Sequence, residues 1–164
     1  MKPLFSLLAA ALLLSGCSAA PEGSNPSPQP FRNSFQCDVP LEQDFPPVQS
    51  ASDLLANMQH MSQRLQARNF VAGQWLAQND SLSERDHINA CHTALLQGAR
   101  RLIDAQYQAV YPTLASAEQR DALKAVMAAW RTAMQGITPQ GVNDQQLTVY
   151  TQAAQTLRML LPAY

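Results

Sequence analysis

The chain has 164 residues, which is enough for one ordinary domain and too few for two. It carries 11 Lys and Arg against 12 Asp and Glu, and only 14% of its residues are charged. A nucleic-acid-binding protein needs a basic face, so this balance argues against one. Apart from residues 4–14, no apolar run approaches the roughly 18–20 residues of a membrane-spanning helix.

Residues 1–16 have the pattern of a signal peptide, with Lys2 followed by an apolar stretch that is too short to span a bilayer. The stretch ends in Leu14-Ser15-Gly16-Cys17, which resembles the lipobox of bacterial lipoprotein precursors. The resemblance implies cleavage after Gly16, diacylglycerol on the Cys17 thiol and an acylated new amino terminus. Three acyl chains exceed the two signals that stable membrane attachment needs. The alternative is an ordinary signal peptide that a cysteine follows by chance.

Residue 18 bears on which membrane would hold such a lipoprotein. In many lipoproteins of double-membraned bacteria, an Asp after the lipidated Cys retains the protein in the inner membrane. This chain has Ser18 instead. The resemblance therefore implies a lipid anchor in the outer membrane, with the domain facing the periplasm rather than the cell surface.

Residues 17–36 are predicted to be the lipidated amino terminus and a flexible linker. Seven prolines lie between Pro21 and Pro47, and proline both lacks an amide donor and disfavours helix in the residue before it. Such a linker would reach about 24 Å as a random coil and about 60 Å as polyproline II. The segment from Cys37 to Pro47 contains Val39 and Phe45 and is expected to pack onto the domain.

Cys37 and Cys91 are the two cysteines that follow Cys17. An exported chain meets an oxidising compartment, which favours a disulfide between them. The loop-entropy estimate gives such a bridge about 4 kcal/mol of stabilisation. The alternative is that Cys91 is a small buried residue and Cys37 a free thiol.

A metal site is a competing interpretation of the same region. His87 and Cys91 stand four residues apart on one helix face, a spacing that metal sites use. His92 points about 100° away from them, and the only other histidine is His60. Since a metal site needs three or four ligands, we predict that this chain has none.

Residues 37–164 are predicted to form an all-α domain, an antiparallel four-helix bundle. The first helix is expected to begin at the N-cap Ser52, and the apolar residues of 70–76 either extend it or form a short second piece after Gly73. The expected buried faces of the four helices are Leu54, Met58, Met61 and Leu65; Ile88, Cys91/His92, Leu95, Ala99, Leu102 and Val110; Leu123, Val126, Met127, Trp130, Met134 and Ile137; and Leu147, Tyr150, Ala154, Leu157 and Leu161.

Capping patterns fix the start of the other three helices. Ser81, Ser116 and Asn143 are each followed three residues later by Glu or Gln, the spacing of a capping box. Proline or glycine is expected to end these helices, at Tyr111-Pro112, at Gly136 with Thr138-Pro139, and at Pro162.

No catalytic constellation stands out in the chain. It has neither a Gly-rich phosphate loop nor a GxSxG motif. Asp104 could pair with Glu118 or Asp121, but these acids lie near predicted helix ends, where carboxylates usually serve caps and helix dipoles. We therefore predict no enzyme, no catalytic residue and no cofactor.

Three further resemblances concern the helical part. Asp104, Tyr107, Ser116–Arg120 and Ala129-Trp130-Arg131 are similar to the helical hairpin of LprI-type lysozyme-inhibitor proteins, although the closing cysteine of that family is missing. Leu114–Arg120 is similar to one copy of the LTxxQ motif of periplasmic helical chaperones. In architecture, the combination of lipid anchor, linker and small disulfide-tied bundle resembles the pilotins that escort secretin subunits to the outer membrane.

The leading hypothesis is a non-enzymatic, lipid-anchored domain that binds another envelope protein. A pilotin-like domain would hold an amphipathic helix of its partner in a groove between its own helices. The alternative is an inhibitor of an envelope-directed hydrolase such as lysozyme. A third possibility is a metal protein or enzyme that uses His87 and Cys91.

Overall fold

A computed structural model describes residues 41, 44–78 and 81–162. The signal peptide, Cys17, the linker and Cys37 lie outside these residues, so what the sequence predicts for them remains a prediction. Among the described residues, none of the helices is long and apolar enough to cross a membrane.

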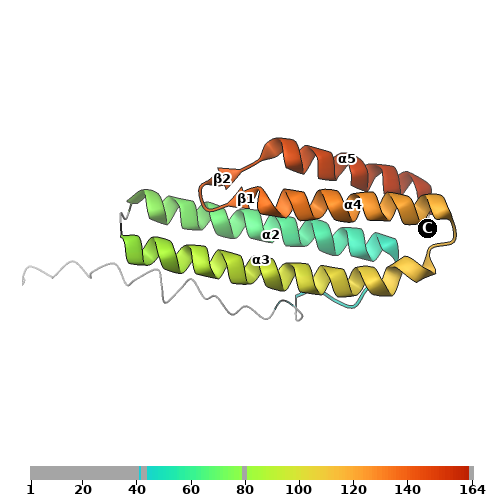
Figure 1. The fold of residues 1–164 in the computed structure, drawn as a ribbon, viewed down its shortest axis with the longest axis horizontal. Coiled ribbons are helices and arrows are strands. Elements are labelled where there is room, and N and C mark those ends of the chain that lie inside the picture. Colours follow the sequence, from blue (N-terminus) through green and yellow to red (C-terminus); the bar gives the residue numbers. More distant parts are fainter. Residues whose placement is uncertain (1–40, 42–43, 79–80, 163–164) are drawn as a thin grey trace, which may run out of the picture.

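Four α-helices make up most of the described chain, which confirms the all-α prediction. They are α2 (Ala51–Gln78), α3 (Leu82–Val110), α4 (Ala117–Gln135) and α5 (Asp144–Leu160). A short 3-10 helix, η2 (Tyr111–Thr113), precedes α4, and two short strands, β1 (Ile137–Thr138) and β2 (Gly141–Val142), lie between α4 and α5. The helices lie side by side along the long axis of the molecule, α2 next to α3 and α4 next to α5 (Figure 1).

The start of α2 corrects the sequence prediction. The helix begins at Ala51, and its first turn is capped by Ser50 rather than by Ser52. The Ser50 hydroxyl accepts from the Asp53 amide at 3.1 Å, and the Asp53 carboxylate accepts from the Ser50 amide at 2.9 Å. Because both donors are satisfied reciprocally, Asp53 takes the part of the acid in a capping box. The helix then continues through Gly73 without a break, so no separate second piece forms.

The predicted starts of the other three helices are confirmed. Ser81, Ser116 and Asn143 each accept from the amide three residues later. Of these three caps, the one at Ser116 is a full capping box, since the Gln119 side chain also accepts from the Ser116 amide. These local hydrogen bonds set where each helix begins and so fix the lengths of the connections between them.

The core lies between the predicted apolar faces, and Trp130 of α4 is fully buried within it. Its indole Nε1 donates to the Met58 carbonyl and to the Ser62 hydroxyl, both at 3.2 Å, so the ring joins α4 to α2. Of the predicted positions, His92, Leu102, Leu147 and Leu161 are only partly buried. The apolar seam of every helix is otherwise in the core.

The segment before α2 packs onto the domain, as expected for Phe45, whose side chain is buried. The Pro46 carbonyl accepts from Asn57 Nδ2 at 3.1 Å and from Gln106 Nε2 at 3.4 Å. These two amides come from α2 and α3, so the segment is fastened to both helices. Val39 lies outside the described residues.

The antiparallel hairpin of β1 and β2 was not predicted. Ile137 pairs with Val142 and Thr138 with Gly141, leaving Pro139 and Gln140 in the turn. Gly141 has a φ of 153°, a conformation that favours glycine. The Pro139 carbonyl lies so near α2 that a Cβ on Gly73 would be 2.5 Å from its oxygen. A glycine in mid-helix therefore lets the hairpin approach α2.

Candidate functional site

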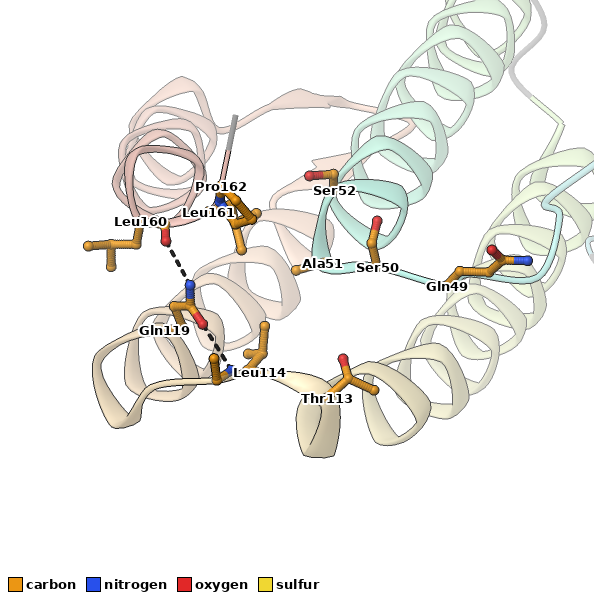
Figure 2. Close-up of a pocket in the computed structure, with 11 residues that line it drawn as sticks. Gln49, Ser50, Ala51, Ser52, Thr113, Leu114, Gln119, Leu160, Leu161 and Pro162 are labelled. Carbon is orange, nitrogen blue, oxygen red and sulfur yellow. Dashed lines mark hydrogen bonds between the residues drawn. The ribbon is translucent and has the colours of Figure 1, made fainter. Parts of the chain in front are cut away.

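Two depressions of similar size lie at opposite ends of the molecule. One is at the connector end, which comprises η2 and the residues that follow it, the start of α2 and the end of α5. It encloses about 590 Å³ (Figure 2). It is lined by Gln49, Ser50, Ala51, Ser52, Thr113, Leu114, Ala115, Gln119, Leu160, Leu161 and Pro162.

Gln119 and Ser50, two polar residues that line the connector-end cavity, make hydrogen bonds to nearby parts of the chain. Gln119 Nε2 donates to the Leu160 carbonyl at 2.7 Å, and its Oε1 accepts from the Ala115 amide at 3.1 Å, so this side chain bridges the cavity mouth (Figure 2). Ser50 is occupied by its cap with Asp53. These hydrogen bonds hold chain segments together, which is a structural role.

The other depression is a groove of about 580 Å³ at the hairpin end, which comprises the hairpin, the second half of α2 and the start of α3. We call it the hairpin groove. Its lining residues come from all three elements: Gln66, Asn69, Phe70, Gly73, Gln74, Leu76 and Ala77 of α2, Arg85 of α3, and Thr138–Val142.

Large apolar side chains lie exposed on this groove. Phe70 is 68% exposed and Val142 is 39% exposed, and they line the groove from α2 and from the hairpin. Val71 and Leu82, on the neighbouring parts of α2 and α3, are exposed as well. Water contact with apolar surface costs about 25 cal/mol per Å², so a ligand that covered these side chains would gain from their burial.

A buried polar residue also lines the groove. Asn69 is 2% exposed, and its Nδ2 donates to the Ile137 carbonyl at 3.3 Å and lies 3.1 Å from His92 Nδ1. Its Oδ1 finds no hydrogen-bond partner among the described residues. Burial lowers the pKa of His92 below its ordinary value of 6.5. The neutral imidazole fits the contact, since it leaves Nδ1 able to accept from the amide.

Of the four residues considered for a metal site, only His87 and Cys91 lie together among the described residues. Cys91 is fully buried with its Sγ 3.6 Å from His87 Nε2, as their spacing on one helix face predicts. His92 instead contacts Asn69, and His60 packs its ring against Phe45 at 5.0 Å between centroids. Within the described part of the chain, no group of three or more His, Cys, Asp or Glu side chains could hold a metal ion. The pairing of Cys91 with Cys37 stays a prediction, because Cys37 is outside that part.

The carboxylates proposed as a pair have separate partners. Asp104 accepts from Arg131 Nη2 at 2.7 Å, and Asp121 accepts from Lys124 Nζ at 3.0 Å. Arg120 Nη1 donates to the Leu114 carbonyl at 2.7 Å. The residues that carry the likeness to lysozyme inhibitors and LTxxQ chaperones therefore cap α4 and join it to α3 and to the segment before α4.

Sequence analysis missed both Asn69 and Phe70, although the helical period marks them. The buried face of α2 runs through Leu54, Met58, Met61 and Leu65, and its next positions are residues 69 and 72. Asn69 is thus a polar residue on the buried face, and Phe70 is an aromatic residue off it. A polar residue on the buried face next to an aromatic residue on the exposed face is a sequence signal that could have identified this site.

Comparison with known proteins returned no family model, no curated protein and no solved structure that matches this chain.

Proposed function

We propose that this chain is a non-enzymatic lipoprotein, anchored through Cys17 in the bacterial outer membrane, whose domain binds another envelope protein. In this proposal the four helices form an antiparallel bundle like that of a pilotin. Short connections and the side-by-side placement of consecutive helices support the bundle (Figure 1). The lipobox resemblance supports the anchor.

The hairpin groove is the observation that carries the binding proposal. Phe70 is a large, rigid apolar side chain exposed at the groove, and aromatic residues are enriched among those that contribute most to protein interfaces. An amphipathic helix of the partner would place apolar side chains at spacings of three and four residues between Phe70 and Val142. Its polar face would remain in water.

A site-specific crosslinking experiment tests the proposal. A photoreactive phenylalanine analogue is placed at Phe70 in the full chain, which is expressed in its native envelope, and crosslinked proteins are identified by mass spectrometry. The matched control carries the analogue at Met159, which is 78% exposed near the end of α5, away from the hairpin. We expect one envelope protein to crosslink from position 70 and not from position 159.

A second variant tests whether the groove itself supplies the affinity. With the photoreactive residue moved to Val142, which also lines the groove, Phe70→Glu puts a charge where the partner's apolar face would lie and should lower recovery of the crosslinked partner at least tenfold, whereas Met159→Glu should not. The same protein captured equally from positions 70 and 159, or recovery from position 142 unchanged by Phe70→Glu, would rule out the groove as the binding site.

The lipid anchor and the disulfide have their own tests. Cys17→Ala should abolish palmitate labelling and release the protein from the outer-membrane fraction. Mass spectrometry of a non-reduced digest should show one peptide pair joined through Cys37 and Cys91. Loss of either result removes that part of the proposal without touching the groove.

The inhibitor of an envelope-directed hydrolase remains the alternative. No described contact favours it, since the residues that resemble lysozyme inhibitors serve as helix caps and ion pairs. Slowing of lysozyme by the purified chain at stoichiometric ratios, unaffected by Phe70→Glu, would favour it over groove binding.

A further inference from the structure

A polar contact centred on Asn69 joins α2, α3 and the hairpin. Asn69 Nδ2 lies within hydrogen-bond distance of both His92 Nδ1 and the Ile137 carbonyl. A carboxamide nitrogen can only donate, so His92 Nδ1 must accept and the neutral ring carries its proton on Nε2. These three groups, from three different elements, form what we call the polar cluster.

We propose that the polar cluster is a proton-sensitive contact which holds the hairpin against α2 and releases it when His92 is protonated. A proton on Nδ1 would point an N–H at the Asn69 amino group, so two donors would face each other. This inference concerns the chain alone and does not depend on any partner.

Asn69 can relieve that conflict in only one way that keeps its bond to His92. Turning the carboxamide over would direct Oδ1, which has no hydrogen-bond partner among the described residues, toward the protonated ring. The same rotation would set an oxygen against the Ile137 carbonyl, so the hydrogen bond to β1 would be lost. Ile137 is fully buried, so water could not readily replace the lost donor, and an unsatisfied buried carbonyl destabilises the closed hairpin.

Few charges surround His92 that could oppose this response. On α2, Arg64 and Arg68 lie on the two turns around Asn69, and the hairpin from Ile137 to Val142 carries no titratable side chain. Within two turns on α3 the titratable residues are Arg85, Asp86 and His87. Asp86 is exposed and six residues away, so no carboxylate contacts the ring to hold its proton.

The direction of the pH effect follows from the lowered pKa of His92. The unfolded chain, with an ordinary His pKa near 6.5, binds a proton more readily than the folded chain does. The contribution of the cluster is therefore complete above pH 6.5 and is lost as the pH falls through the lowered pKa. Between pH 6.5 and the lowered pKa of His92, a single linked proton predicts up to about a tenfold increase in hairpin opening for each pH unit of acidification.

The test follows hydrogen-exchange protection of the hairpin amides by NMR in the purified full chain from pH 8 to pH 5. Protection factors of the hairpin amides, of which Pro139 has none, should stay constant above about pH 6.5, fall by up to about tenfold per pH unit below it, and level off once His92 is protonated in the folded chain. Amides in the middle of α4 should not respond. In His92→Gln the side-chain oxygen can accept from Asn69 at every pH, so hairpin protection should become independent of pH, while His87→Gln should retain the dependence.

Two outcomes would overturn the proposal. One is hairpin protection that stays constant while His92 titrates. The other is a neutral His92 whose ¹⁵N shifts place the proton on Nδ1. Both are measured on the unaltered protein, so the proposal can be rejected even if His92→Gln does not fold.

Discussion

The depressions at the two ends of the molecule differ in the residues that line them. The connector-end cavity is lined in part by Gln119 and Ser50, which make hydrogen bonds that hold the neighbouring chain in place. The hairpin groove is lined by a buried Asn69 and an exposed Phe70. Burying a polar group and exposing an aromatic ring both cost stability. The contrast is what we expect if the connector end serves the fold and the hairpin end serves the proposed binding.

The largest expected effect compares one leucine from each end. Leu123 of α4 is fully buried near the connector end, and Leu123→Ala should lower the free energy of unfolding by about 2–5 kcal/mol, because it removes core contacts and leaves a cavity. Leu82 is exposed at the start of α3, so Leu82→Ala should change it by less than about 0.5 kcal/mol. Urea unfolding measures both, and a similar loss in the two variants would contradict the contrast.

The next effect tests how closely the hairpin approaches α2. A Cβ at Gly73 would lie 2.5 Å from the Pro139 carbonyl oxygen, so Gly73→Ala must displace backbone and should cost about 1–3 kcal/mol. Gly98 is the matched control, because its Cβ would meet side-chain atoms and no backbone, with Leu41 Cδ1 at 3.3 Å and Arg101 Nη2 at 3.9 Å. There alanine's better helix propensity, about 1 kcal/mol, should offset the contact. Thermal unfolding compares the stability of the two variants. If Gly73→Ala were as stable as the unaltered protein, the hairpin would not lie as close to α2 as the structure shows.

The helix caps show where sequence prediction succeeds in this chain and where it fails. The caps at Ser81, Ser116 and Asn143 were predicted correctly because each involves residues only three apart. At the start of α2 two serines compete, and the choice of Ser50 depends on Asp53, an acid that the Glu/Gln form of the capping box does not include.

The hairpin groove depends instead on contacts between distant parts of the chain. It exists because Pro139 meets Gly73 and because Asn69 bonds Ile137, and helical periodicity carries no information on such pairs. A two-residue strand is also too short to show alternation. The fold was therefore predictable from local patterns. At the candidate site, the helical pattern could mark Asn69 and Phe70 but could not show that the hairpin lies against them.

A smaller effect separates the two serines at the connector end. Ser50→Ala removes the acceptor for the Asp53 amide and should cost about 1 kcal/mol. Ser52 is exposed within the first turn of α2, and Ser52→Ala should cost less than about 0.5 kcal/mol. Chemical denaturation of the two variants compares them directly. The reverse order of losses would restore Ser52 as the cap.

The smallest effect on stability belongs to the residue that should matter most for binding. Phe70 is 68% exposed, and Ala is the better helix former, so Phe70→Ala should leave the free energy of unfolding within about 0.5 kcal/mol of its original value. Crosslinking of the partner from position 142 should nevertheless be lost, because the Phe70 ring supplies apolar contact area at the groove. A stability loss as large as that of Leu123→Ala would instead place Phe70 among the residues that hold the fold, and the exposed ring would no longer mark a binding surface.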